Sequence, residues 1–294
     1  MELISVKGLR AALPYLRHFG GKLFVVKVGG EALESRETID SLVEQLTILH
    51  QLGIRFVLVH GGGTQATQLG ERLGVESTFI EGRRVTSPEA VDVLVMALNG
   101  TARTAILSSC RRHQLPAVGV SGVDAGIVRA EKRPEVKLSD GTKVNYGQVG
   151  DICGLNLEPL RGLIEMGTVP VVSSLSADDA GTVLNINADD VAAALAVGLQ
   201  ATKLVMVTQP RGILTDIADP QSLISELTLA ELADLEAKGT IKTGMLPKSK
   251  AVRTALTGGV ESVHIVSYDF PDAILVEVFT NEGCGTMIVQ GATA

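Results

Sequence analysis

The chain has 294 residues, of which 45% are hydrophobic, and 33 acidic against 26 basic side chains give it a formal net charge of −7. This length and composition predict a globular protein with one large α/β domain or two fused lobes, and they exclude an intrinsically disordered chain. The acidic balance argues against non-specific binding to nucleic acid and against docking on anionic membranes.

The sequence also predicts a cytoplasmic location. The first residues lack an apolar stretch followed by a small-residue cleavage site, and the apolar run from Val191 to Leu199 is too short to span a bilayer. The three cysteines, Cys110, Cys153 and Cys284, are isolated and odd in number. They therefore predict neither a disulfide framework nor a metal cluster, which is typical of a reducing compartment.

The first predicted element is an amphipathic helix over residues 5–19, which Pro14 should kink or divide. Because it precedes the first strand, this helix either caps an edge of the sheet or reaches a neighbouring subunit as an arm. Residues 23–28 then predict a buried strand, in which apolar residues lead to Lys27. A lysine at the end of a strand, beside bare backbone N–H groups, is a natural phosphate ligand.

Two successive strands that each end in glycines are the strongest structural signal in the chain. Strand 23–28 is followed by Gly29 and Gly30 and by a helix over 36–51, and strand 55–60 is followed by Gly61–Gly63 and another helix. In an open parallel sheet, ligands bind beyond the carboxyl ends of the strands, where helix N-termini attract anions. The two loops therefore predict a cradle for phosphates or for a phosphoryl group in transfer.

The remaining elements alternate strands with helices. A small hairpin at 77–85 carries Arg83 and Arg84, and a β-hairpin at 126–149, with a turn at Asp140 and Gly141, is expected to shape or cover a substrate pocket. The other predicted helices are 87–99, 103–113, 156–166, 185–199, 228–238, 246–257 and 271–278, and the other strands are 117–120, 169–172, 204–207, 263–266 and 286–289. This order predicts a mostly parallel sheet with helices on both faces.

Several common catalytic motifs are absent. The chain has no G-x-x-x-x-G-K-[ST] loop and no G-x-G-x-x-G after the first strand. His60-Gly-Gly-Gly is similar to an esterase oxyanion loop, but no G-x-S-x-G elbow accompanies it. We therefore interpret His60 as a packed or turn residue rather than a base. No spacing of His, Cys and Glu predicts a metal held by the protein.

Lys27, Asp189 and Lys248 remain as candidates for chemistry. Two lysines from opposite halves of the chain suit phosphoryl transfer, because fixed cations stabilise the charge on the transferring group. The aspartate would orient both ammonium groups. Taken singly, Asp189 is better explained as a helix cap, and Lys248 is better explained as a solvated lysine. Their joint occurrence with the glycine loops favours phosphoryl transfer.

Five motifs resemble the amino acid kinase family, and within it the arginine-inhibited members that phosphorylate N-acetyl-L-glutamate. In order along residues 12–290 they are Lys27-Val-Gly-Gly, His60-Gly-Gly-Gly, Gly82-Arg-Arg-Val-Thr86, Asn185-Ile-Asn-Ala-Asp189 and Gly244-Met-Leu-Pro-Lys248. The resemblance implies an open αβα sandwich with a mostly parallel central sheet. It also implies transfer of the γ-phosphate of ATP, with Mg²⁺ carried by the nucleotide, to the side-chain carboxylate of N-acetyl-L-glutamate in arginine synthesis.

The resemblance also assigns roles by position. Lys27 and Lys248 become the transition-state cations, and Asp189 becomes their organiser. Arg84 would pair with the α-carboxylate of the substrate and Asn185 with its acetamido group. The full implied set is Gly29, Gly30, Gly62, Gly63, Arg84 and Asn185 for the substrate, and Thr208, Gly212, Met245 and Lys248 for the nucleotide.

The N-terminal segment resembles the extra helix of arginine-inhibited members, which joins dimers into a hexameric ring. This implies a homo-oligomer, a dimer or a hexamer, with arginine as effector at Tyr15, His264, Glu277 and Gly283. A stretch rich in Ser, Asp and Gly near 175–180 suggests a lobe boundary, so we expect three parts: an arm over 1–20, a substrate lobe over 21–176 and a nucleotide lobe over 177–294. The chain departs from the family pattern at Thr208–Arg211, Thr243, Ser174–Ser176 and Ser267–Asp269, in the nucleotide and effector regions.

Two other functions stay open. One is a related kinase that acts on carrier-bound aminoadipate or glutamate. The other is a non-catalytic regulatory module, like the kinase-like domain of acetylglutamate synthases, which carry a further acetyltransferase domain. The length of the chain and the retention of both lysines and the aspartate favour the enzyme.

Overall fold

The computed structural model describes residues 6–138, 141–216, 219–241 and 244–291. Its centre is an eight-stranded sheet in the order β16-β18-β17-β13-β1-β2-β10-β5, in which every neighbouring pair is parallel except β17 and β18. The strands are β1 Leu23–Val28, β2 Arg55–His60, β5 Ala117–Ser121, β10 Val169–Ser173, β13 Lys203–Thr208, β16 Glu226–Thr228, β17 Ser262–Ser267 and β18 Thr286–Val289.

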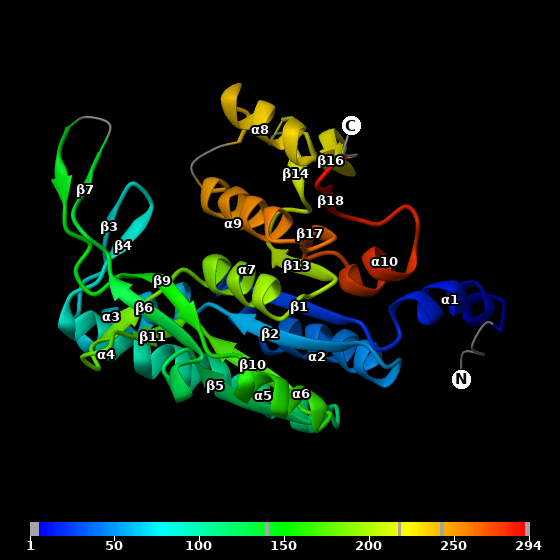
Figure 1. The fold of residues 1–294 in the computed structure, drawn as a ribbon, viewed down its shortest axis with the longest axis horizontal. Helices are drawn as coiled ribbons and strands as arrows, with labels where there is room; N and C mark the ends of the chain where they lie inside the picture. Colours follow the sequence, from blue (N-terminus) through cyan, green and yellow to red (C-terminus); the bar gives the residue numbers. More distant parts are fainter. Residues whose placement is uncertain (1–5, 139–140, 217–218, 242–243, 292–294) are drawn as a thin grey trace.

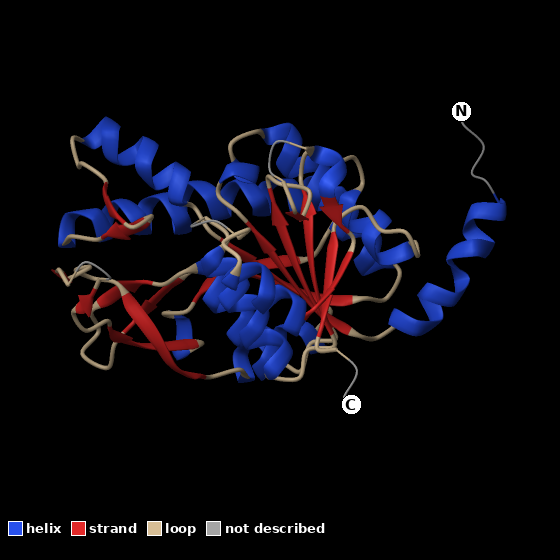
Figure 2. Ribbon diagram, turned by 90° about the horizontal axis from the view of Figure 1, so that it is seen from above, coloured by secondary structure: helices blue, strands red, loops and turns tan. Residues whose placement is uncertain are grey.

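Helices cover both faces of this sheet (Figure 2). Successive residues of β1 alternate between the two faces, so that Phe24 and Val26 enter one hydrophobic core and Val25 enters the other. The first core includes α2 Arg36–Gln51, α5 Arg103–Arg112 and α10 Ala273–Phe279, and the second includes α6 Glu158–Glu165, α7 Ala188–Gly198, α8 Leu229–Ala237 and α9 Leu246–Thr257. The prediction of an open αβα sandwich is confirmed.

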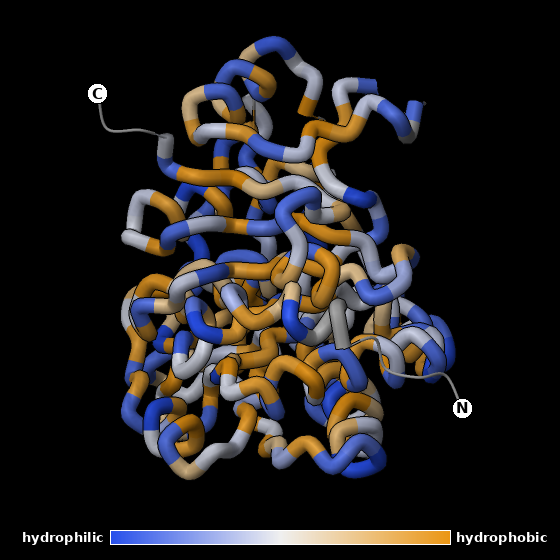
Figure 3. The backbone as a smooth tube through the Cα atoms, turned by 90° about the vertical axis from the view of Figure 1, so that its right-hand side faces the viewer, coloured by the Kyte–Doolittle hydropathy of each residue, from blue (hydrophilic) through white to orange (hydrophobic). Residues whose placement is uncertain are grey.

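Hydrophobic stretches run through the middle of the molecule, and hydrophilic stretches gather on the outer turns (Figure 3). The main sheet is continuous across the predicted lobe boundary, because β5, β10, β2 and β1 come from residues before 176 and the other four strands come from residues after 177. Both segments therefore share one sheet, and the division into a substrate lobe and a nucleotide lobe stays a prediction.

The region predicted as one hairpin at 126–149 is more elaborate. A second sheet has the order β12-β11-β6-β9, with β6 Val128–Lys132, β9 Gly150–Leu155, β11 Leu175–Ala177 and β12 Val183–Asn185. Between β6 and β9, a short hairpin of β7 Val136–Lys137 and β8 Lys143–Val144 projects from the body (Figure 1). Asp140, in the predicted turn, lies outside the described residues.

A further hairpin, β3 Thr78–Ile80 and β4 Arg83–Val85, lies at the same end of the molecule (Figure 1). It is fixed to the β8–β9 connection through Thr86, whose N–H donates to the carbonyl of Tyr146 and whose carbonyl accepts from the N–H of Gln148. The hairpin that carries Arg83 and Arg84 is therefore held in place by backbone hydrogen bonds.

The two helices predicted at 87–99 and 103–113 form one continuous helix over Pro88–Arg112. It consists of α4 Pro88–Val95, a π-helical segment Met96–Ala102, and α5. By length and composition alone this helix could cross a membrane, a property that core helices share. Here it packs against α2, α3 Gly63–Leu73 and β5, so it is a core helix of this fold.

The N-terminal helix α1, Val6–Phe19, runs on through Pro14 rather than being divided there. It lies at one end of the molecule, beside α10 (Figure 1). Phe19 at its end is buried and meets the ring of Phe24 edge-on, with 5.4 Å between the ring centroids. This contact joins the helix to the central sheet.

Candidate functional site

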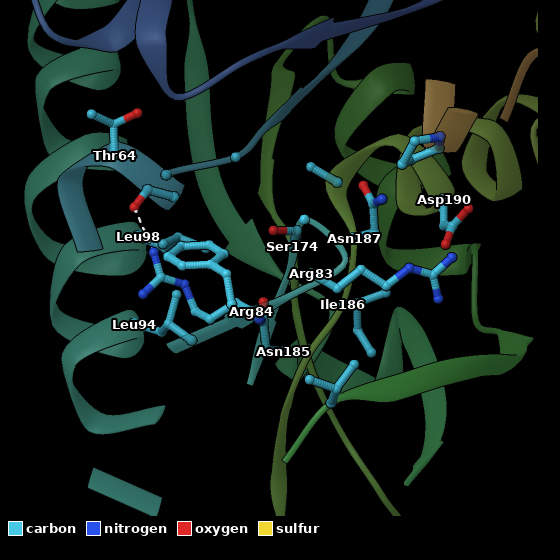
Figure 4. Close-up of a pocket in the computed structure, with 18 of the residues that line it drawn as sticks. Thr64, Arg83, Arg84, Leu94, Leu98, Ser174, Asn185, Ile186, Asn187 and Asp190 are labelled. Atoms are coloured by element: carbon cyan, nitrogen blue, oxygen red, sulfur yellow. Dashed lines mark hydrogen bonds between the residues drawn. The ribbon is translucent and has the colours of Figure 1, made fainter. Parts of the chain in front are cut away.

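A cavity of about 540 Å³ opens beyond the carboxyl ends of β1 and β2 (Figure 4). Its walls come from the N-termini of α3 and α7, from the hairpin β3–β4, from β12 and from the first turns of α9. Of the predicted substrate-binding residues, Gly62, Gly63, Arg84 and Asn185 line it. The cavity therefore lies where an open parallel sheet is expected to bind its ligand.

The structure brings the two glycine loops into contact. A Cβ atom on Gly30 would lie 3.1 Å from the backbone nitrogen of Gly63 and 3.4 Å from the Cα atom of Gly62. Gln65, which no sequence pattern singles out, joins the loops because its Nε2 donates to the carbonyl of Gly30 at 2.8 Å. Glycine is required here by close backbone approach rather than by an unusual φ angle.

Free N–H groups and two helix N-termini lie at this cavity or directly beside it. Between the described residues, no hydrogen bond uses the N–H of Gly30, Gly62 or Gly63, whereas Gly29 donates its N–H to the carbonyl of Val207 at 3.3 Å. Helix α3 begins after Gly62, and helix α7 begins after Asn187, its N-cap. Such N-termini carry partial positive charge and attract anions.

A buried ion pair lies at the start of α7. Lys27, at the end of β1, places its Nζ 2.7 Å from Oδ1 of Asp189, and each side chain is only 7% exposed. The next aspartate, Asp190, lies 3.5 Å from Lys250 and is more exposed. Because removing two charges from water is costly, a buried pair at this position is better explained by a role in binding or catalysis than by stability.

Lys248 is not part of this pair. It lies in the first turn of α9, partly exposed, and no carboxylate among the described residues lies within 4.0 Å of its ammonium group. The structure thus brings together Lys27 and Asp189 but leaves Lys248 apart from them. Neither Lys27, Asp189 nor Lys248 is among the described residues that line the cavity.

The other predicted nucleotide-binding residues lie near the carboxyl end of β13 and the start of α9. Thr208 ends β13 and donates from its hydroxyl to the carbonyl of Pro210 at 3.0 Å. Gly212 packs so closely on Thr286 that a Cβ atom would lie 2.3 Å from its hydroxyl oxygen. Met245 is the N-cap of α9 and packs on the core beneath α7. Within the described chain, these residues stay outside the cavity lining.

The four predicted effector residues gather around α10. Nδ1 of His264 lies 2.7 Å from Oε1 of Glu277, both side chains are buried, and Gly283 is so close that a Cβ atom would lie 2.8 Å from Glu277 Oε2. Tyr15 of α1 donates to the side chain of Asn281. Burial lowers the pKa of His264, whereas burial of Glu277 is outweighed by its hydrogen bonds, so the pKa of Glu277 is lowered.

His60 is fully buried at the end of β2. Its Nδ1 donates to the carbonyl of Gly61 at 2.8 Å, and its Nε2 has no hydrogen-bond partner among the described residues. Burial lowers the pKa of His60 to about 4, and the nearby Arg103 adds to this effect. A neutral imidazole that orients Gly61 fits the interpretation of His60 as a turn residue rather than a base.

We expect His60 to make folding stability depend on pH. Its pKa is about 4 in the folded chain and about 6.5 in an unfolded one. Between pH 6.5 and pH 4, His60 binds a proton in the unfolded chain but stays neutral in the folded chain. The stability contributed by neutral His60 is therefore complete above pH 6.5 and is lost as the pH falls towards 4. Between pH 7 and pH 5 the loss is about 2 kcal/mol.

Urea unfolding at both pH values measures this loss. His60→Asn keeps a donor near Gly61 without taking up a proton, so the difference between pH 7 and pH 5 should shrink by about 2 kcal/mol. The exposed His18→Asn variant is the control and should retain the wild-type difference. An unchanged difference in His60→Asn would contradict the assignment.

Comparisons with known proteins agree with this geometry. The model of the amino acid kinase family matches residues 22–267. The chain is 44% identical over 287 residues to an acetylglutamate kinase of Myxococcus xanthus, covering 96% of this chain and 93% of that protein. It is 39% identical to an acetylglutamate kinase of Archaeoglobus fulgidus, covering 97% of this chain and 99% of that one.

Solved structures share the fold. N-acetylglutamate synthase from Neisseria gonorrhoeae, complexed with coenzyme A and N-acetyl-glutamate, superposes with a TM-score of 0.84 at 28% identity; the match covers 98% of this chain but only 64% of that one. Carbamate kinase from Giardia lamblia bound to AMP-PNP gives a TM-score of 0.67 at 19% identity over 92% of this chain and 99% of that one, a likeness of fold alone. The family model covers most of the chain, and full-length relatives share about 40% of their residues with it. The chain therefore belongs to the amino acid kinase family.

Proposed function

We propose that this chain is an enzyme that transfers the γ-phosphate of ATP to the side-chain carboxylate of N-acetyl-L-glutamate, a step of arginine synthesis. The observation that carries the proposal is the buried Lys27–Asp189 pair at the start of α7, together with the free N–H groups of Gly30, Gly62 and Gly63 in the two glycine loops. The names of the full-length relatives support the choice of acceptor.

Catalysis in this proposal is positioning and electrostatics. The acceptor carboxylate is already an ionised nucleophile, so no general base is needed. The glycine N–H groups and the helix N-termini of α3 and α7 stabilise the charge on the transferring phosphoryl oxygens. Lys27 adds a fixed ammonium group, which Asp189 holds in place at 2.7 Å. Lys248 reaches the same phosphoryl group from α9, and Thr208, Gly212 and Met245 border the nucleotide.

ATP enters as a substrate, with Mg²⁺ bound mainly to its phosphates. Within the described part of the chain, no group of three or more His, Cys, Asp or Glu side chains gathers that could hold a metal ion. In the proposed reaction the nucleotide carries the metal, which neutralises charge on the β- and γ-phosphates. The free cysteines Cys110, Cys153 and Cys284 fit our proposal of a cytoplasmic enzyme.

A hydroxamate assay tests the function, because hydroxylamine traps only an acyl phosphate. With ATP, Mg²⁺ and N-acetyl-L-glutamate, the wild-type chain is expected to form the hydroxamate. Parallel reactions with carrier-linked aminoadipate or glutamate distinguish the related kinases. Product with a carrier-linked acid and none with N-acetyl-L-glutamate would overturn the proposed acceptor.

A second candidate is a regulatory kinase-like module without catalysis. The TM-score of 0.84 to N-acetylglutamate synthase of Neisseria gonorrhoeae favours it, although this chain matches only 64% of that one. The same assay separates the two, because a regulatory module yields no hydroxamate with any acceptor. The Lys27–Asp189 pair favours the enzyme.

We also propose that arginine inhibits the enzyme at the cluster of Tyr15, His264, Glu277 and Gly283, and that α1 joins dimers into a hexamer. A solved N-acetylglutamate synthase of Neisseria gonorrhoeae is complexed with L-arginine, and it is 26% identical over 98% of this chain and 66% of that one. The contact between Tyr15 and Asn281 links α1 to the loop after α10, so a ligand bound there would meet both.

Removing the arm tests this proposal. A chain that begins at residue 21 is expected to lose arginine inhibition and to form dimers, as measured by initial rates with arginine and by light scattering. Because this cut also removes Phe19 from its packing on Phe24, Tyr15→Phe serves as the milder variant. It keeps the ring and loses only the hydrogen bond to Asn281, so it should weaken inhibition and leave the hexamer intact. Unchanged inhibition in the truncated chain would overturn the effector site.

A further inference from the structure

The cavity has a basic lining in an acidic protein. Four basic side chains and two acidic ones are among the described residues that form its walls, in a chain of net charge −7. Two of the four are paired with carboxylates. Arg133 makes hydrogen bonds of 2.6–3.1 Å to Asp151, and Lys250 lies 3.5 Å from Asp190. The other two, Arg83 and Arg84, have no carboxylate partner among the described residues.

Arg84 nevertheless uses most of the N–H donors of its side chain in hydrogen bonds to other residues of the chain. Its Nη1 donates to the hydroxyl of Ser77 at 2.5 Å, and its Nη2 donates to the carbonyl of Gly63 at 3.0 Å and to the hydroxyl of Thr67 at 2.7 Å. Its guanidinium also lies over the ring of Phe79, 4.7 Å from the centroid. Three of its five N–H groups are therefore used, including both on Nη2, so a two-pronged contact to a carboxylate would require breaking one of these bonds.

Arg83 is in the opposite situation. No hydrogen bond or ion pair joins its side chain to any described residue, although it is close enough to Asp151 to help lower the pKa of that carboxyl group, after the larger effect of Arg133. It is exposed to the cavity, so all five of its N–H groups are available. A guanidinium with a complete set of donors can bind two oxygens of a carboxylate or phosphate at once.

The two arginines point to different parts of the cavity. They are neighbours on β4, and side chains of neighbouring strand residues extend in opposite directions. Figure 4 shows Arg84 directed towards Leu94 and Leu98, and Arg83 directed past Ile186 towards Asp190 at the start of α7. Arg83 therefore brings a cation from the hairpin β3–β4 towards the helix N-terminus next to the Lys27–Asp189 pair.

We propose that Arg83 is a substrate-binding residue that holds two oxygens of an anionic group in this cavity, in addition to Arg84, which also contacts the α3 loop through Gly63 and Thr67. This inference rests on the proposed function for the identity of the ligands. The anionic group is a carboxylate of the acceptor or the terminal phosphate of the nucleotide. Both present paired oxygens to the same guanidinium.

Steady-state kinetics with two acceptors distinguish these sources. 4-Acetamidobutyrate is N-acetyl-L-glutamate without its α-carboxylate. If Arg83 binds that carboxylate, Arg83→Gln should raise the KM for N-acetyl-L-glutamate about 10- to 100-fold and leave the KM values for ATP and 4-acetamidobutyrate unchanged. If Arg83 binds the terminal phosphate, the KM for ATP should rise with either acceptor. Arg83→Lys keeps the charge without the two-pronged geometry and should give intermediate values.

Arg111→Gln is the matched control, since Arg111 is an exposed arginine at the end of α5, outside the cavity lining. KM values in Arg83→Gln that equal those of this control overturn the proposal. Calorimetric titration of wild type and Arg83→Gln with N-acetyl-L-glutamate and with ATP gives a second readout without turnover. If the wild type shows no kinase activity, the proposed function fails, and Arg83 is judged by binding alone. Weaker binding of either ligand to Arg83→Gln supports the proposal, whereas equal binding, or no binding to the wild type, overturns it.

Discussion

Replacing Asp189 by asparagine is expected to lower the free energy of unfolding by about 3–5 kcal/mol and to reduce kcat by about 10²- to 10³-fold. The stability loss follows because the amide leaves the ammonium group of Lys27 buried, with no compensating charge at its 2.7 Å contact. The kinetic loss follows from the proposed mechanism, in which Asp189 holds that ammonium group beside the transferring phosphoryl group. Urea unfolding measures the first effect and the hydroxamate assay the second.

Asp190→Asn is the stability control for this variant. It is the next residue of the same helix, it makes the same chemical change, and its own partner Lys250 is 60% exposed and 3.5 Å away. Exposed pairs of this kind contribute about 0.2–1 kcal/mol. A comparable loss of stability in both variants would show that the buried Lys27–Asp189 pair contributes no more to the free energy of unfolding than the exposed pair does. A wild-type kcat in Asp189→Asn would remove Asp189 from the proposed mechanism.

The elements that follow from local patterns could be predicted closely. Strands β1 and β2 and helices α2 and α9 have the bounds that their apolar periodicity indicates. Strands β11, β12 and β16 were missed because each has only three residues, too few for an alternating pattern to show. The continuous helix over Pro88–Arg112 was divided because Gly100 and Thr101 are poor helix formers, whereas the π-helical segment bridges them in the structure.

In the candidate site, too, features set by local sequence could be predicted, and features set by tertiary contacts could not. Glycine loops after neighbouring strands predict a shared ligand site, because parallel strands end at one edge of the sheet. The bond from Gln65 to Gly30 crosses 35 residues and has no sequence signal. Which arginine of the pair is free also depends on tertiary contacts, since Ser77 and Thr67 reach Arg84 only after α3 and the hairpin pack together.

Lys248→Ala is expected to reduce kcat by about 10²- to 10³-fold while the free energy of unfolding stays within about 0.5 kcal/mol of wild type. Stability is spared because the ammonium group is partly exposed and has no carboxylate within 4.0 Å among the described residues. The same lack of a partner leaves it available for phosphate oxygens. Helix α9 packs along α7, whose first turn carries Asp189, so Lys248 lies on a helix that neighbours the proposed reaction site.

Lys238→Ala separates this role from a general loss of positive charge. Lys238 is an exposed lysine at the end of α8, and its removal should leave kcat unchanged. In the proposed mechanism Lys248 contacts the phosphoryl group rather than the acceptor. The KM for N-acetyl-L-glutamate should therefore stay the same in both variants, and the loss should appear in kcat. A kcat for Lys248→Ala close to that of Lys238→Ala would mean that Lys27 alone supplies the catalytic cation, since Lys248 is the residue that the structure leaves apart from Asp189.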